Sequence, residues 1–137
     1  MSEIVYAREQ DLPVADYVEV IGETFMRDSR PIGSPDRVAQ MLAGSNFIVT
    51  ARDTDGTILG LARCMNDGAW VCYCADLAVR ESLQGRGIGK ALLDKMAELL
   101  GPRVGIALIA YPEAAPFYRR IGLDEYPAFF RERTDGA

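Results

Sequence analysis

The sequence predicts an α/β fold in which helices cover both faces of one mixed sheet. Segments with the periodicity of strands and helices follow one another in the order β-α-α-β-β-β-α-β-α-β, so helices flank a run of three consecutive strands. The later strand–helix–strand unit is a crossover, which makes its two strands parallel neighbours. A chain of 137 residues is long enough for a single domain, residues 1–137, with its own hydrophobic core.

The first part of the chain predicts one strand and two helices. Residues 3–8 have the alternation of a strand. A helix is expected to begin after Asp11, as its N-cap, with Pro13 in the first turn, and to run to about residue 25. The same cap logic predicts a second helix over residues 34–43. Four apolar residues of the first helix are expected to face the sheet: Val14, Tyr17, Val18 and Ile21.

Three strands follow, over residues 47–52, 57–65 and 69–79, and an Asp-Gly pair at the first connection predicts a tight hairpin turn. The third strand is the longest. Strict alternation divides its side chains between two faces. One face is expected to carry Trp70, Cys72, Cys74 and Asp76, and the other Val71, Tyr73, Ala75 and Leu77.

The second half predicts a main helix over residues 87–100, ended by Gly101 and Pro102. Residues 104–110 are continuously apolar, which is typical of a buried central strand. A short helix over residues 112–121 and a last strand or hairpin over residues 126–133 complete the chain.

The composition argues against several classes of partner and site. The net charge is −5, and residues 1–79 carry six Arg against twelve Asp and Glu, which argues against a nucleic-acid partner. No apolar run has the length of a membrane span, and the N-terminus lacks the features of a secretion signal, so we expect a cytoplasmic protein without a membrane partner. Cys64, Cys72 and Cys74 are expected to be reduced core side chains. With no histidine and no Cys-x-x-Cys, no metal site is expected.

A glycine-rich turn joins the strand that ends at Val79 to the main helix. Gly85, Gly87 and Gly89 lack a Cβ, so a ligand can approach the backbone closely. The helix start leaves its first N–H groups unpaired at the positive end of the helix dipole, which favours phosphate. The spacing Gly-x-Gly-x-Gly is neither the dinucleotide fingerprint nor a P-loop. The turn therefore predicts a different phosphorylated ligand.

Two motifs resemble the GNAT acetyltransferase superfamily. The first is the acyl-CoA-binding motif, a strand ending in Leu-x-Val, then four residues, Gln or Arg, two residues and Gly-x-Gly; it corresponds here to Leu77, Val79, Gln84, Gly87 and Gly89. The second is the family's Ala-x-x-apolar-Tyr-x-x-x-Gly-Phe segment, which residues 114–123 resemble. Leu123 replaces the usual Phe, and Tyr111 stands where the family often has Asn.

The resemblance implies a GNAT-like fold and an N-acetyltransferase that uses acetyl-CoA as the acyl donor. It also implies that the donor is bound by the turn and its surroundings. The cofactor-binding residues expected on this basis are Leu77, Ala78, Val79, Gln84, Gly85, Arg86, Gly87, Ile88, Gly89, Lys90 and Phe117. A backbone N–H between Leu77 and Val79 is expected to stabilise the oxyanion.

Tyr118 occupies the family's Tyr position, which implies a general acid that protonates the leaving thiolate. A phenol has a pKa of about 10 and a thiol of about 8.5, so the phenol keeps its proton at neutral pH. The alternative is a packed helix tyrosine. Asp76 is a candidate general base, because a carboxylate within an apolar strand is costly unless it is paired or functional. A structural hydrogen-bonding role for Asp76, with water chains deprotonating the amine, is the alternative.

The expected acceptor is a primary amine of a small molecule. Residues 25–35 and 126–130 are the segments expected to shape its pocket, and neither carries a recognisable motif. Two other functions stay open: a non-catalytic acyl-CoA-binding sensor, and an acetyltransferase for protein lysines or N-termini. A homodimer is an open alternative to a monomer.

Overall fold

The computed structural model describes residues 3–135. The chain folds as two compact units, of which the first extends to Ala107 and the second begins at Leu108. Within the described residues, no helix has the length and apolar character needed to span a membrane.

The first unit is built on a sheet with the strand order β1-β2-β3-β4-β5. Neighbouring strands from β1 to β4 are antiparallel. β5 begins beside the start of β4, where the Gly105 N–H donates to the Trp70 carbonyl at 2.8 Å, as the predicted parallel crossover requires. The strands are β1 Val5–Arg8, β2 Phe47–Arg52, β3 Ile58–Asn66, β4 Val71–Val79 and β5 Gly105–Leu108.

The prediction of a buried central strand over residues 104–110 is wrong. The regular strand covers only Gly105–Leu108, it is the last in the strand order, and its side chains are exposed or half-buried. A continuously apolar run is typical of a strand covered on both faces, whereas β5 is an edge strand whose side chains are not fully covered on either face.

The helices of the first unit are α1 Val14–Gly22, the short 3-10 helix η1 Phe25–Asp28, α2 Pro35–Ala43 and α3 Ile88–Leu100. Pro13, not Asp11, occupies the N-cap of α1, and α1 ends at Gly22 instead of residue 25. Thr24 explains the early end: its hydroxyl donates to the Ile21 carbonyl at 2.9 Å and accepts the Met26 N–H at 3.1 Å. These bonds close α1 and start η1.

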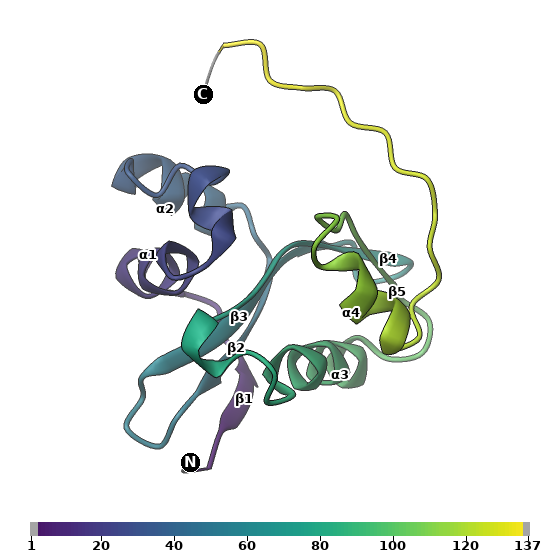
Figure 1. The fold of residues 1–137 in the computed structure, drawn as a ribbon, viewed down its shortest axis with the longest axis horizontal. Coiled ribbons are helices and arrows are strands. Elements are labelled where there is room, and N and C mark those ends of the chain that lie inside the picture. The colour runs from purple at the N-terminus through teal and green to yellow at the C-terminus, as the bar shows by residue number, and fades with distance from the viewer. Residues whose placement is uncertain (1–2, 136–137) are drawn as a thin grey trace. The chain divides into compact units, whose positions relative to one another are not determined.

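α1 and α3 pack on opposite faces of the sheet (Figure 1). The Tyr17 hydroxyl of α1 donates to Asp76 of β4. On the other face, Leu92 of α3 lies beside Gly60 of β3, and Gly60 pairs with Val79 of β4. Side chains alternate along β4, so Asp76 and Val79 point to opposite faces. Each fully buried apolar side chain contributes about 1.5–3 kcal/mol. The buried apolar residues of the two helices are Tyr17, Val20, Ile21, Ile88, Leu92, Leu93 and Met96.

A β-bulge interrupts the pairing of β3 with β4. Arg63 pairs with Asp76 and Cys64 pairs with Cys74, so Ala75 is the extra residue. The bulge reverses the alternation, and Asp76 lies on the face opposite Cys74. The prediction that these two share a face is therefore wrong. All three cysteines, Cys64, Cys72 and Cys74, are buried, as predicted.

Gly60 is required by the close approach of β4. A Cβ at this position would lie 2.9 Å from the Ala78 carbonyl oxygen. We expect Gly60→Ala to lower the free energy of unfolding by about 1–3 kcal/mol, because backbone must shift to relieve the clash. Urea unfolding measures the change. Gly33→Ala is the matched control, because a Cβ there meets nothing within 4 Å. Equal stability of the two variants would contradict the expectation.

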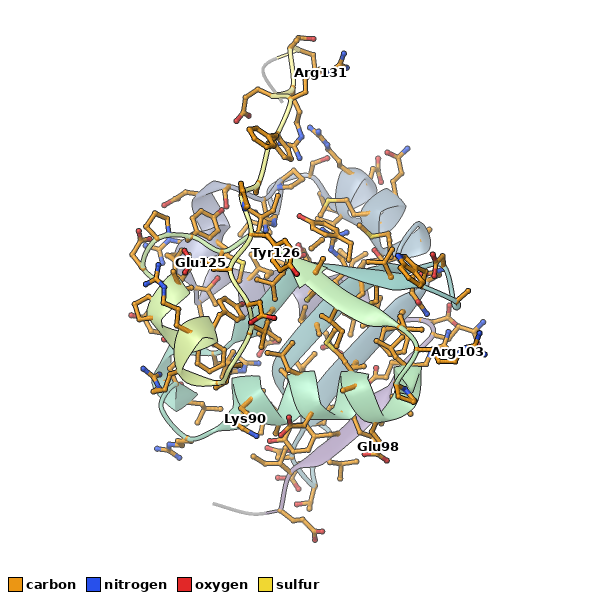
Figure 2. All side chains as sticks on the ribbon, turned by 90° about the vertical axis from the view of Figure 1, so that its right-hand side faces the viewer. Lys90, Glu98, Arg103, Glu125, Tyr126 and Arg131 are labelled. Carbon is orange, nitrogen blue, oxygen red and sulfur yellow. The ribbon has the colours of Figure 1, made fainter. Side chains whose placement is uncertain are left out.

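The second unit contains α4 Ala115–Arg120 and the C-terminal segment 123–135. Figure 2 shows Tyr126 and Arg131 on this segment. The predicted strand or hairpin over residues 126–133 is wrong, since the described part of the segment contains no strand. A strand is stable only when it pairs with others, and Pro127 cannot donate to a ladder. Three aromatic side chains stay exposed here: Tyr126, Phe129 and Phe130.

Candidate functional site

The glycine turn follows β4 as predicted. A short 3-10 helix, η2 Glu81–Leu83, leads into it, and α3 begins at Ile88. Gly85 and Gly87 both have φ of +83°, a left-handed backbone that favours glycine. A Cβ added at either would meet nothing within 4 Å. The space beside these two residues is therefore open to a ligand.

The start of α3 presents main-chain donors. The first helical bond runs from the Ala91 N–H to the Gly87 carbonyl at 3.0 Å, so the N–H groups of Ile88, Gly89 and Lys90 have no acceptor within the helix. Gly87 is the N-cap and supplies no side-chain acceptor, and the first turn has no acidic residue. Three such donors at the positive end of a 13-residue helix suit a polyanion such as the pyrophosphate of CoA.

The side chains around the glycine turn differ in their contacts and exposure. The Gln84 side chain donates to the Val79 carbonyl at 3.2 Å and so closes the turn against the end of β4. Arg86 is exposed. Lys90 pairs with Asp94 at 2.8 Å on the exposed side of α3, and Figure 2 shows it near the start of that helix. Ile88 is buried, so it can offer a ligand only its main-chain N–H.

Arg80 fixes the turn to the first helix. Its guanidinium donates to the Ile58 carbonyl at 2.6 Å and to Glu19 at 2.5 Å, and it also pairs with Glu23. Glu19 belongs to α1, and Glu23 is its C-cap. The end of β4 is thus held against α1 at the point where the glycine turn begins.

The end of β4 also has main-chain N–H groups that do not face β3. The Arg80 N–H donates to the Leu59 carbonyl of β3 at 3.0 Å. Antiparallel pairing alternates, so the N–H groups of Leu77 and Val79 point toward the other edge of β4. The Gln84 bond to the Val79 carbonyl agrees with this direction. Both residues lie within the range, Leu77 to Val79, in which the sequence predicted an oxyanion donor.

Asp76 lies at the centre of a buried polar network. One carboxylate oxygen accepts the Tyr17 hydroxyl and the Arg63 Nε, each at 2.6 Å. The other oxygen accepts the Arg30 Nε at 2.6 Å. The Arg63 Nη1 donates in turn to the Ser45 hydroxyl at 3.1 Å. Two guanidinium groups therefore surround one buried carboxylate.

These contacts set the protonation of the network. Burial alone would raise the pKa of Asp76, but the charges of Arg63 and Arg30, with the Tyr17 hydrogen bond, hold that pKa below its ordinary value. Burial and the Asp76 charge raise the pKa of the Tyr17 hydroxyl. An anion held by two arginines accepts a proton poorly. These contacts favour the structural role of Asp76 over the role of general base.

The sequence did not predict the partners of Asp76. Tyr17 was expected only as a core residue, and Arg30 and Arg63 were given no role. The sequence could have indicated Arg63 as a partner, because it is a cation within the apolar strand 57–65. The neighbouring strand contains a single internal carboxylate. Opposite charges at internal positions of neighbouring strands indicate a buried pair.

The lowered pKa of Asp76 makes stability depend on pH. A carboxylate with a depressed folded-state pKa stabilises the fold above its unfolded pKa of about 4, and this contribution is lost as pH falls toward the folded value. We expect Asp76→Asn to be about 3–5 kcal/mol less stable at pH 7, because two buried arginines lose their counter-charge. This deficit should shrink below about pH 4.

Urea unfolding of both proteins from pH 7 to pH 3 tests this expectation. Asp94→Asn is the control, since Asp94 is exposed and its pairing with Lys90 should matter by less than about 0.5 kcal/mol. Tyr17→Phe gives a milder perturbation, because it removes one donor and keeps the ring. A deficit for Asp76→Asn that does not change with pH would show that the carboxylate charge is not responsible.

In the second unit, Tyr118 lies on α4 and packs edge-to-face against Phe117, with ring centroids 5.0 Å apart. Both side chains are half-buried. Tyr111 precedes α4, and its carbonyl accepts the N–H groups of Ala114 and Ala115 at 2.9 and 3.1 Å. The main chain of Tyr111 thus starts the helix that carries Tyr118.

Comparison with known proteins identifies the class. The acetyltransferase (GNAT) domain family matches residues 43–122, and the chain belongs to this family. The fold agrees. A GNAT family acetyltransferase of Streptococcus pneumoniae TIGR4 superposes with a TM-score of 0.69 at 22% identity, covering 96% of this chain and 100% of that one. An aminoglycoside acetyltransferase from a soil metagenomic sample, in complex with sisomicin, gives a TM-score of 0.74 at 17% identity, with 96% and 97% covered.

Curated relatives include plant enzymes. Serotonin N-acetyltransferase 2, chloroplastic, of Oryza sativa subsp. japonica is 32% identical over 127 residues, which cover 85% of this chain and 64% of the rice protein. Histone acetyltransferase TAP1 of Glycine max is 36% identical over 72 residues, covering 51% of this chain and 31% of the soybean protein. The chain therefore spans only part of the length of the curated relatives that it matches. The predictions of a GNAT fold and of membership in the GNAT acetyltransferase family are confirmed.

Proposed function

We propose that this acetyltransferase transfers the acetyl group of acetyl-CoA to a primary amine of a small molecule. The glycine turn is the observation that supports acetyl-CoA as the acyl donor. Gly87 is a left-handed N-cap, and three N–H groups without helical acceptors follow it in a first turn without acidic residues. This arrangement supports binding of the CoA pyrophosphate at the start of α3.

The reaction needs few side chains. The thioester supplies an activated acetyl group, and the neutral amine must be held against its carbonyl carbon. We assign the N–H groups of Leu77 and Val79 to the developing oxyanion, because they point away from β3 at the end of β4. Tyr118 is proposed to give its phenolic proton to the leaving thiolate. Since Asp76 is occupied by two arginines, water is left to remove the proton from the amine.

The acceptor class rests on two supports. A relative that covers 85% of this chain is named a serotonin N-acetyltransferase, and serotonin is a small primary amine. The acidic balance of residues 1–79 favours a cationic or neutral acceptor over an acidic one. Acetylation of protein lysines is the second candidate, because the soybean relative is named a histone acetyltransferase.

A panel of acceptors tests the proposal. Purified protein is incubated with acetyl-CoA and, separately, serotonin, tyramine, spermidine, sisomicin, a lysine-containing histone tail peptide and a peptide with a free N-terminus. Thiol release and mass spectrometry of the acceptor are measured. We expect the highest kcat/KM with a small amine. Faster turnover of a peptide would favour the second candidate, and acetyl-CoA binding without turnover of any amine would overturn the enzymatic proposal.

A further inference from the structure

The connection between α1 and α2 contacts β4 of the sheet through the side chain of Arg30. Arg30 lies between η1 and α2, in the segment expected to shape the acceptor pocket. Its Nε donates to Asp76 at 2.6 Å, and its Nη2 donates to the Ala75 carbonyl at 3.0 Å. One planar guanidinium therefore holds both the bulged residue and the carboxylate that follows it.

The position of these contacts connects them to catalysis. Ala75 is the extra residue of the bulge in β4, and the carbonyl of an extra residue lacks the regular ladder partner that its neighbours have. Arg30 provides that carbonyl with a donor. The proposed oxyanion donor, the Leu77 N–H, lies two residues further along the same strand. The direction of that N–H depends on how the bulge is held.

Arg30 is also the member of the Asp76 network whose removal should disturb the buried charges least. Its side chain is 20% exposed, against 10% for Arg63 and 0% for Asp76. Without Arg30, the Asp76 carboxylate keeps Arg63 and Tyr17 as partners, so the buried charge stays compensated. Removal of Arg63 or Asp76 would instead leave a buried charge with less compensation.

We propose that Arg30 is a positioning residue for acetyl transfer, an inference that rests on the proposed function. It joins the acceptor-side connection to the bulge of β4 and thereby fixes the Leu77 N–H relative to the acceptor. It does not contact the reacting atoms. Its loss should therefore impair the chemical step and acceptor binding, and leave the glycine turn and acetyl-CoA binding as they are.

The test compares Arg30→Met, Arg30→Lys and the control Arg103→Met. Arg103 is an exposed arginine outside the donor and acceptor segments. Kinetics use acetyl-CoA with the amine of the panel that is turned over fastest. For Arg30→Met we expect kcat to fall on the order of 10-fold or more, the acceptor KM to rise, and the acetyl-CoA KM to stay within about twofold. Arg30→Lys should be intermediate, since an ammonium can pair with Asp76 but lacks the planar fork.

Amide hydrogen exchange over residues 74–78 is the second readout, and it does not require turnover. We expect faster exchange in Arg30→Met than in Arg103→Met, with similar thermal midpoints. If Arg30→Met matches Arg103→Met in exchange, the proposed positioning is wrong. If exchange changes but kcat is the same in both, Arg30 has a purely structural role. If no amine is turned over by the wild type, the proposed function fails, and exchange alone decides whether Arg30 holds the bulge.

Discussion

Gly87→Val is expected to weaken acetyl-CoA binding by about 100-fold, which corresponds to about 2.7 kcal/mol. Two effects add at this position. A valine side chain would occupy the open space beside the first turn of α3, where the pyrophosphate is proposed to lie. A φ of +83° is also unfavourable for a β-branched residue, so the N–H groups that follow would be shifted from their present directions. Isothermal titration calorimetry with acetyl-CoA measures the loss.

Backbone strain alone must be separated from the loss of the ligand site. Gly56, in the β2–β3 hairpin turn, has nearly the same φ of +86°, and a Cβ there also meets nothing within 4 Å. Gly56→Val should therefore show a similar loss of stability, about 1–2 kcal/mol, with unchanged acetyl-CoA affinity. If Gly87→Val binds acetyl-CoA as tightly as Gly56→Val does, the phosphate site lies elsewhere.

Local signals in the sequence were sufficient for most of the first unit. β2 has the bounds that alternation and the Asp-Gly turn predicted, and β3, β4, α2 and α3 begin and end within about two residues of their predictions. The turn was predictable because its chemistry is local: three glycines and a helix start lie within a few residues. The same holds for the N–H groups at the start of α3, where we propose that phosphate binds.

Features that depend on distant partners were not predictable in this way. The bulge at Ala75 results from how β3 and β4 pair, and a period of two along β4 alone gives no sign of it. The role of Asp76 depended on Arg30, 46 residues earlier, and on Tyr17, 59 residues earlier. Whether residues 104–110 form a central strand depended on a strand from the C-terminal segment, where none is found among the described residues.

The proposed role of Tyr118 depends on the chemistry of its phenol more than on the local structure around it. Its position on α4 matches the family's second motif, and the hydroxyl of a phenol with a pKa of about 10 still carries its proton at neutral pH. A thiolate leaving from a thioester gains a proton only as the bond to carbon breaks. A donor that acts at this moment stabilises the transition state and not the bound substrates.

Tyr118→Phe should consequently lower kcat on the order of 100-fold while the KM for acetyl-CoA changes little. The ring stays, so its edge-to-face contact with Phe117 is kept and stability should be close to that of the wild type. Tyr6→Phe is the matched control, since Tyr6 lies on β1, outside the donor and acceptor segments. Pre-steady-state mixing must first show that acetyl transfer, and not product release, limits kcat. With that established, a Tyr118→Phe enzyme as fast as Tyr6→Phe would show that Tyr118 is not the general acid, and the thiolate would have to take its proton from water.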